Sequence, residues 1–287
     1  MLDEQDKLIT FKSSCSSFNP VNPDSDMVTT TSSTEPILSS ETAITSLDAE
    51  DNQIRYYAAW WLGKHQIQSA CAALCHQLQD VRYRTVQGGY PLRRQAARAL
   101  GQLKNIQAVP ALIDALNCDE DEQFREVVIE ALGKIGDASA AYPLLQLLQS
   151  GKVQPYEALI EALGELRVLE ARALVEPFLQ HSSERVQCAA ARYLYLITQK
   201  PEYLERIIEN LNHENPYLRW AAAFDLGAIG HIQAAEAIVQ AKVGNSLKLL
   251  NLKRILETVL ESNKSELEKQ QATQTLFQII DELLIQL

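Results

Sequence analysis

Apolar residues recur along most of the chain at the spacing of one helix face and do not alternate as they would in a strand. From residue 52 onward a Leu-Gly pair occurs five times, with steps of 38, 32, 31 and 63 residues between successive glycines. The last step spans two periods, and the skipped copy falls at Leu194-Tyr195. The five pairs are Leu62-Gly63, Leu100-Gly101, Leu132-Gly133, Leu163-Gly164 and Leu226-Gly227. A period of about 32 residues predicts a solenoid of repeated helical units.

The positions around each glycine predict two helices in every repeat. Small or aliphatic residues stand four and five positions before the glycine, and an alanine stands seven positions after it. Small residues allow neighbouring helices to approach closely, and we expect the glycine to end the first helix of each pair. One pair cannot bury its own apolar face, so stacking must form the core. The predicted fold is an all-α, right-handed αα superhelix of about six helical pairs over residues 46–260.

The two ends of the chain differ from the repeats. Residues 13–46 hold 16 Ser or Thr among 34 positions, a composition that cannot bury enough apolar surface to order itself. We therefore expect a disordered arm over residues 1–45, with a docking tail or a chloroplast transit peptide as alternatives; early acidic residues argue against the transit peptide. At the other end, Leu276, Ile280 and Leu283 fall at helical spacing. They predict an amphipathic helix within residues 261–287 that either caps the solenoid or docks a partner.

Composition excludes several classes of protein. The net charge of −11 disfavours non-specific nucleic-acid binding, which requires Lys and Arg to meet phosphates. No apolar run approaches the roughly 18 residues that indicate a membrane span, and the first residues lack the pattern of a secretory signal. Five scattered cysteines fit a reducing compartment, so we expect a cytoplasmic protein. The sequence contains no phosphate-binding glycine loop, nucleophile elbow or HExxH zinc motif.

Aromatic residues replace charged ones in the first and sixth repeats. Seven and three positions before the glycine, the middle repeats carry Arg94/Arg98, Glu126/Glu130 and Glu157/Glu161, which predict one solvated helix face. The same positions hold Tyr56 and Trp60 in the first repeat and Trp220 and Phe224 in the sixth. In the first repeat each of these aromatic residues is followed by another, Tyr57 and Trp61. Exposed aromatic clusters typically bind a ligand or a partner. The alternative is that these side chains cap the ends of the stack.

Positive charge is concentrated in the first two repeats. Between residues 52 and 113 there are eight basic residues and one acid, Asp80, and such an island attracts anions. Four arginines share one repeat position, which favours a structural role toward carbonyls or acids of the adjacent repeat: Arg55, Arg93, Arg125 and Arg219. Four others lie off that position and are better candidates for an anionic ligand or a partner: Arg82, Arg84, Arg94 and Arg98. A solvated face is the alternative for each.

One connection and three reactive side chains complete the candidates. The segment 80–91 makes the first step six residues longer than the norm, and it carries Tyr90 as well as two of those arginines. Insertions in solenoids often lie on the binding face, although a plain spacer is possible. His65 replaces an aliphatic residue and is a weak candidate for proton transfer. Cys71 and Cys75 stand one helical turn apart, but they occupy apolar positions of the repeat, so we expect no metal site and no covalent role.

Two stretches resemble a known family. Residues 55–63, RYYAAWWLG, and residues 88–101, GGYPLRRQAARALG, are similar to E-type subunits of heterodimeric phycobilin lyases, which are built from short HEAT-type repeats. The resemblance covers about residues 45–260 and leaves the Ser/Thr-rich arm outside. Repeats of this kind serve many functions, so the repeat alone says little about activity.

The resemblance implies a function. It implies a lyase subunit that attaches phycocyanobilin through a thioether to the apo α subunit of phycocyanin, together with an F-type partner subunit and without a tightly bound cofactor. The aromatic rings would lie against the bilin and arginines would bind its propionates. Alternatives are the E-type subunit of the isomerising phycoerythrocyanin lyase, a non-catalytic phycobiliprotein chaperone or disassembly factor, and a generic scaffold. No nucleic acid and no membrane insertion are expected.

Overall fold

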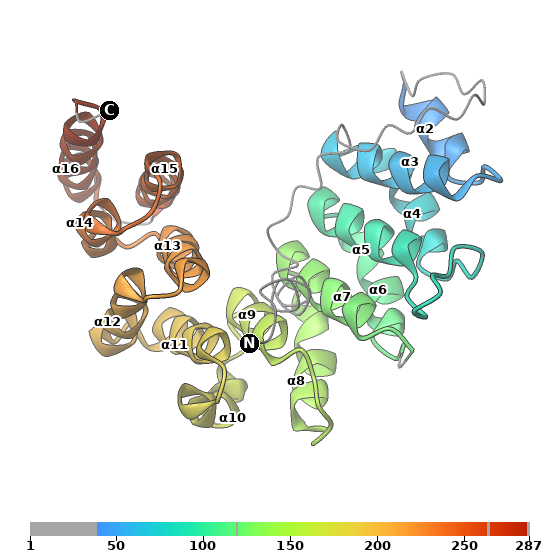
Figure 1. Ribbon diagram of the computed structural model, residues 1–287, viewed down its shortest axis with the longest axis horizontal. Helices are drawn as coiled ribbons and strands as arrows, with labels where there is room; N and C mark the ends of the chain where they lie inside the picture. Colours follow the sequence, from blue (N-terminus) through green and yellow to red (C-terminus); the bar gives the residue numbers. More distant parts are fainter. Residues whose placement is uncertain (1–38, 119, 263–264, 286–287) are drawn as a thin grey trace, which may run out of the picture. The chain divides into compact units, whose positions relative to one another are not determined.

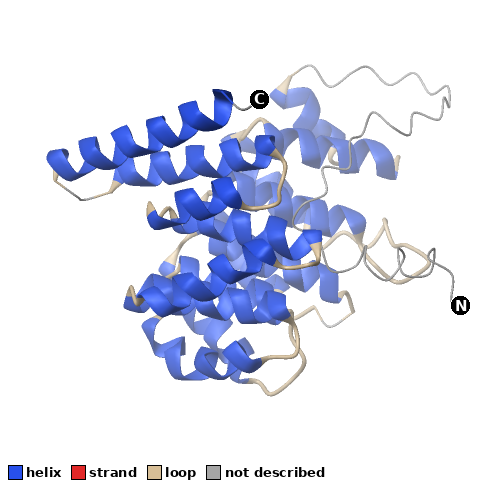
Figure 2. Cartoon of the chain, turned by 60° about the vertical axis from the view of Figure 1, so that its left-hand side comes forward, coloured by secondary structure: helices blue, strands red, loops and turns tan. Residues whose placement is uncertain are grey.

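The chain folds into pairs of helices that stack in chain order (Figure 1). The computed structural model describes residues 39–118, 120–262 and 265–285. The first helices of the pairs are α3 (Asn52–Lys64), α5 (Pro91–Leu103), α7 (Glu122–Ile135), α9 (Tyr156–Glu165), α11 (Glu184–Thr198), α13 (Pro216–Ile229) and α15 (Asn245–Glu261). The second helices are α4 (Cys71–Gln77), α6 (Val109–Ala115), α8 (Ala141–Gln149), α10 (Arg172–Val175), α12 (Pro201–Glu209), α14 (Gln233–Gln240) and α16 (Glu266–Ile285). Figure 2 shows no strand among the described residues, which confirms the all-α solenoid.

The first helices form a continuous layer. Each packs against the next, from α3 through α5, α7, α9, α11 and α13 to α15. Short 3₁₀ turns introduce most of the second helices, and the alanine that follows each repeat glycine by seven residues is buried there or at the start of α14. The small and aliphatic pairs before the glycine are likewise buried. The predicted core positions are therefore confirmed, because the same side-chain sizes are needed at every helix crossing.

The repeat glycines do not end the first helices, which corrects one expectation. Gly63 lies inside α3, and a Cβ atom built on it would stand 2.8 Å from Cα of Ala99 on α5. At Gly133 the corresponding distance to Cα of Ala162 is 3.0 Å. The glycines are thus required by the close approach of neighbouring first helices. The helices end instead at residues with left-handed backbone, such as Lys104 (φ 51°) and Gly136 (φ 76°).

The shared arginine position has a structural role, as predicted. Arg55 is fully buried and its Nη1 donates to Oδ1 of Asp80 at 2.5 Å. Arg93 donates from Nε to the carbonyl of Asp80 at 2.6 Å. Arg125 donates to the carbonyl of Cys118 at 2.9 Å, and Arg219 donates to backbone carbonyls at residues 213, 214 and 242. Arg93, Arg125 and Arg219 thus satisfy carbonyls of the connections between helices, which would otherwise be left without donors, and Arg55 pairs with an acid there.

Both ends of the repeat array are extended by additional helices. Residues 40–46 form α2, which is capped by Ser39 and packs on α3 through the buried side chains of Ala43 and Leu47. The boundary predicted for the arm is corrected accordingly, because two apolar residues are enough to seat this short helix on the first repeat. The arm's residues 1–38 lie outside the described residues. At the C-terminus α15 and α16 form a further pair, and α16 buries Leu276 and Leu283 against the stack.

Candidate functional site

The aromatic side chains of the first repeat form a partly exposed cluster on α3. Tyr57 stacks on Trp60 with ring centroids 5.2 Å apart, and Nζ of Lys64 lies 4.5 Å from the Trp60 ring centroid. Trp61 packs partly buried against the core, and its ring lies 4.2 Å from that of His65. Tyr57 is 42% exposed, more than either Trp60 or Trp61. The cluster offers an aromatic face with an adjacent cation, which suits a flat conjugated anion.

Tyr56 and the sixth-repeat aromatics occupy equivalent places at the two ends of the repeat array. Tyr56 is partly buried on α3, and Phe224 is partly buried on α13. Trp220 is 44% exposed and meets Tyr217 edge to face, with centroids 5.3 Å apart. Four first helices separate α3 from α13 in the stack, so the structure does not bring the two aromatic groups together within this chain.

The connection between the first two repeats is held rigidly by acids. Asp80 is buried and accepts hydrogen bonds from Arg55, Arg82 and the backbone N–H of Tyr83. Burial by itself raises the pKa of Asp80, but these donors outweigh burial and the net pKa is lowered. Farther along, Arg84 lies 4.0 Å from Glu120. These contacts hold Arg82 and Arg84 of the segment in defined positions.

Tyr90 and Arg94 are tied to the third repeat. Tyr90 is buried; its hydroxyl donates to Glu120 at 2.7 Å, and its ring is covered by the guanidinium of Arg93 with 3.9 Å to the centroid. Arg94 donates two hydrogen bonds to the carboxylate of Asp121, from Nε at 3.0 Å and from Nη2 at 2.8 Å. These contacts give both residues a structural role and leave less positive charge for a ligand than the sequence indicated.

Arg98 remains available for a ligand. It is partly buried on α5 and has no hydrogen bond or ion pair among the residues that the structure describes. It shares its repeat position with Trp60 on the adjacent helix α3. An arginine without a counter-ion in the described part of the chain is a suitable partner for a carboxylate, since Arg binds carboxylates through two parallel hydrogen bonds. Of the four arginines that the sequence singled out, Arg98 keeps the strongest case for anion binding.

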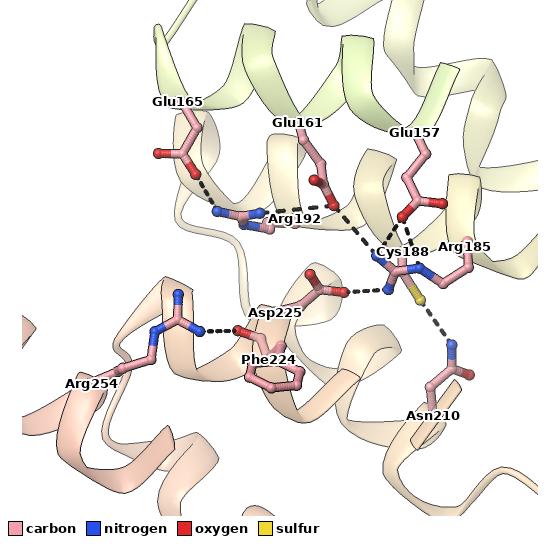
Figure 3. Close-up of polar contacts among 10 residues, drawn as sticks. All are labelled: Glu157, Glu161, Glu165, Arg185, Cys188, Arg192, Asn210, Phe224, Asp225 and Arg254. Carbon is pink, nitrogen blue, oxygen red and sulfur yellow. Dashed lines mark hydrogen bonds and ion pairs between the residues drawn. The ribbon is translucent and has the colours of Figure 1, made fainter. Parts of the chain in front are cut away.

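A cluster of ion pairs joins α9, α11 and α13, and sequence analysis did not predict it (Figure 3). Arg185 donates to Glu157 at 2.7 Å and to Asp225 at 2.9 Å. Arg192 pairs with Glu165, and Glu161 lies between the two arginines. The positions predicted as one solvated face are thus half-buried and ion-paired here, because the first helices pack so closely that these side chains meet across them. The signal in the sequence was the alternation of charge between adjacent repeats at that position, Glu161 followed by Arg192.

Glu161 is the unusual member of this cluster. Its carboxylate lies 3.5 Å from Arg185 and 3.9 Å from Arg192, and its side chain is 27% exposed. Burial raises the pKa of Glu161 to about 7; Asp225 and Glu157 act in the same direction, and the two arginines oppose it. A carboxyl group with this pKa exchanges its proton near neutral pH, which suits it to acid–base chemistry.

Three of the described cysteines are not activated. Burial raises the pKa of Cys75 to about 12, and it also raises the pKa of Cys71. Cys188 is buried beside Asn210, and burial raises its pKa to about 11. No group of three or more His, Cys, Asp or Glu within the described parts of the chain is arranged to hold a metal ion. Likewise, none of the described helices is long and apolar enough to cross a membrane.

Comparisons with known proteins agree with the repeats. The family model of the PBS lyase HEAT-like repeat matches residues 54–80 and 218–243, and that of HEAT repeats matches residues 90–158. The chain is 67% identical to the bilin biosynthesis protein PecE of Mastigocladus laminosus over 262 residues, which is 88% of this chain and 97% of the relative. The chain belongs to the phycobilin lyase family. It is also 44% identical to the phycocyanobilin lyase subunit alpha of Nostoc sp., over 87% of this chain and 95% of that protein.

A solved structure of the family supports the fold. A chain of the complex of CpcE and CpcF of phycocyanin lyase from Nostoc sp. PCC7120 superposes with a TM-score of 0.77 at 42% identity. The match covers 90% of this phycobilin lyase chain and 100% of the other. The expected family and repeat architecture are therefore confirmed, whereas the roles of individual site residues stay predictions.

Proposed function

We propose that this chain is the E-type subunit of a heterodimeric lyase that attaches phycocyanobilin through a thioether to a cysteine of the apo α subunit of phycocyanin. The observation that carries the proposal is the similarity over nearly the whole chain to phycocyanobilin lyase alpha subunits and to a chain of the CpcE and CpcF complex. The partner is an F-type subunit. The bilin is a substrate, no tightly bound cofactor takes part, and the reaction takes place in the cytoplasm of a cyanobacterium.

The chain acts by holding and orienting the bilin. Tyr57 and Trp60 provide an aromatic face for the pyrrole rings, and Lys64, beside Trp60, and Arg98, on the adjacent helix α5, bind the propionates. Cys71 and Cys75, whose pKa values are raised, are poor nucleophiles, which favours direct addition of the acceptor's thiol to the bilin. Positioning the two reactants removes much of the entropic barrier to that addition.

One observation favours a second acceptor. The chain is 67% identical to two bilin biosynthesis proteins PecE but 44% identical to the phycocyanobilin lyase alpha subunit of Nostoc. Since it is more similar to the proteins that are not named for phycocyanobilin attachment, the isomerising phycoerythrocyanin lyase is the second candidate function.

Co-expression tests both candidates. The chain is produced with an F-type subunit, a supply of phycocyanobilin, and either apo α-phycocyanin or apo α-phycoerythrocyanin. A bilin adduct that survives denaturation, formed only when both lyase subunits are present, supports the proposal, and the acceptor that reacts selects between the candidates. An isomerised, blue-shifted adduct selects the phycoerythrocyanin system. Soluble subunits that bind the acceptor without forming any adduct would instead indicate a chaperone.

The aromatic face is tested separately. Tyr57 and Trp60 are replaced together by Ala, and Tyr142, a 68% exposed tyrosine on α8, is replaced by Ala as the control. We expect the double variant to lose bilin transfer or assembly with the F-type subunit while its circular dichroism stays unchanged. Unchanged transfer and assembly by the double variant would remove these residues from the site.

A further inference from the structure

The repeat glycine is replaced by a tyrosine in the fifth repeat. Where the other first helices carry a residue such as Gly63 or Gly133, helix α11 carries Tyr195. The glycines let neighbouring first helices approach closely, whereas a tyrosine needs room for its ring. Accordingly, α11 and α13 pack less extensively against each other than any other two consecutive first helices do. The exchange of glycine for tyrosine thus opens the stack at one place.

A cavity of about 190 Å³ lies at this place. It is lined by the ends of α11, α13 and α15, which follow one another in the yellow to red part of Figure 1, and by Arg167, which comes shortly after α9. The volume corresponds to about six water molecules at their density in the liquid. The cavity is therefore large enough for a small molecule and too small for a whole tetrapyrrole.

Tyr195 brings an unused hydrogen-bond donor to the cavity. The residue is only 5% exposed, and its ring meets that of His231 edge to face with centroids 6.0 Å apart. Within the described parts of the chain its hydroxyl has no hydrogen bond, although it lines the cavity. Burial raises the pKa of Tyr195, so the hydroxyl keeps its proton. Since buried polar groups normally have a partner, this one points to an acceptor that the chain itself does not provide.

Arg167 brings a positive charge that no acid neutralises. Its Nη1 donates to the carbonyl of Leu196 at 3.2 Å, which places the guanidinium next to the residue that follows Tyr195. Its other N–H groups have neither a hydrogen bond nor an ion pair with any residue that the structure describes. Among the described residues that line the cavity, Arg167 is the one Lys, Arg, Asp or Glu. Carbonyls at helix ends carry partial negative charge, and the bond to Leu196 offsets part of it. The lining therefore favours an anion.

The other walls favour an anion with a short hydrocarbon part. Leu196, Ile229 and Val259 supply apolar surface. The hydroxyls of Thr258 and Ser262 already donate to carbonyls of α15, at 3.0 and 2.7 Å, so they offer no further proton. A phosphate would need donors around all of its oxygens, whereas a carboxylate needs them at one end only. The cavity thus matches a carboxylate better than a phosphate.

We propose that the cavity between α11, α13 and α15 binds a small carboxylate. Its two oxygens accept from Arg167 and from the hydroxyl of Tyr195, and its hydrocarbon part, of about three to five carbons, lies on the apolar walls. The carboxylate belongs either to a free organic acid or to the propionate side chain of a tetrapyrrole, since both present the same group. The site is separate from the aromatic face on α3, so the inference does not depend on the lyase function proposed above.

The test measures binding of propionate to the full chain at pH 7, by saturation-transfer NMR and calorimetry. Since Arg167 is exposed and water screens its charge, we expect a dissociation constant of about 1 mM, which so small a ligand can reach. Propylammonium, of similar size and opposite charge, should not bind. Tyr195→Phe removes the hydroxyl alone and Arg167→Met removes the charge, and each should weaken propionate binding at least about tenfold.

Lys104→Met is the matched control for Arg167→Met. Both residues stand three positions after a repeat glycine with a φ of 51°, but Lys104 does not line the cavity, so its replacement should leave binding unchanged. Circular dichroism and urea denaturation verify that all variants fold. Absence of saturable binding, or equal binding by the wild type, Tyr195→Phe and Arg167→Met, would overturn the inference.

A competition experiment distinguishes the two sources of the carboxylate. Displacement of propionate by phycocyanobilin, but not by its dimethyl ester, would show that a tetrapyrrole side chain enters the cavity. Propionate that stays bound in the presence of phycocyanobilin would show that the site serves a free organic acid. A failure to bind propionate would leave the lyase function standing, because the cavity includes none of the residues on α3 and α5 to which the bilin is assigned.

Discussion

The repeat glycines permit a direct test of how tightly the first helices pack. Gly63 is the next-to-last residue of α3, and Gly164 is the next-to-last residue of α9. A methyl group on Gly63 would meet Cα of Ala99 at 2.8 Å, whereas on Gly164 the nearest atoms lie 3.5 Å away. Gly63→Ala and Gly164→Ala are therefore the same change at the same place in a helix, in crowded and in open surroundings.

The two substitutions should have opposite effects on the free energy of unfolding. Replacing Gly by Ala in a helix stabilises it by up to about 1 kcal/mol, and at Gly164 nothing opposes that gain. At Gly63 the added methyl group overpacks the contact with α5, which costs about 1–3 kcal/mol. Helix α3 cannot move away from α5 freely, since α2 packs on α3 and α7 packs on α5. We therefore expect Gly63→Ala to be less stable than Gly164→Ala by about 1–3 kcal/mol.

Urea denaturation followed by circular dichroism at 25 °C measures the difference. Equal stability of the two variants, or a more stable Gly63→Ala, would refute the conclusion that close approach explains the repeat glycine. A change in the slope of the transition would show that a variant altered cooperativity, and the comparison would then be made from the rates of unfolding.

Three further predictions concern buried ionisable groups. Since burial raises the pKa of Glu161 to about 7, the free energy of unfolding falls as the pH rises from 4.5 through 7. Glu161→Gln should therefore be more stable to urea than the wild type at pH 8.5, by up to about 3 kcal/mol in the free energy of unfolding, but not at pH 4.5. Removing Arg55 by substitution with Met leaves Asp80 buried without its closest partner and should cost about 3 kcal/mol in a thermal melt, whereas Arg82→Ala, at the exposed partner, should cost less than about 1 kcal/mol. Cys75, whose pKa burial raises to about 12, should react with iodoacetamide at pH 8 much more slowly than in urea, and Cys75→Ala should retain bilin attachment; fast labelling of the folded chain would contradict its burial.

Much of the fold could be predicted from the sequence because each repeat presents the same packing problem to its neighbour. The alanine after each glycine and the shared arginine are short-range features, and five aligned copies average out local variation. Arg55 and Arg125 illustrate this: their common position alone predicted a structural role toward acids or carbonyls, and in the structure they donate to the carboxylate of Asp80 and the carbonyl of Cys118.

The candidate site was harder to predict because it depends on how several helices come together. Asp225 and Arg185 are 40 positions apart, and they meet only because α11 and α13 stack as neighbours. The sequence indicated that the position of Glu161 faces solvent, since a charged residue recurs there. It could not show that adjacent first helices approach so closely that these charges are half enclosed. Arg94, which the sequence favoured for a ligand, is likewise occupied by Asp121 from the next repeat.

The chain's three tryptophans all lie in the first and sixth repeats, two on α3 and one on α13. Tryptophan fluorescence therefore reports on these two repeats and gives no signal from the four between them. In a stack whose units contact only their neighbours, the ends can melt before the middle. Emission spectra of Trp60 and Trp61 will accordingly record fraying of the first repeat, while helix signals still register an intact centre. The tryptophans are local probes of unfolding, and a single fluorescence midpoint should not be taken as the melting point of the whole stack.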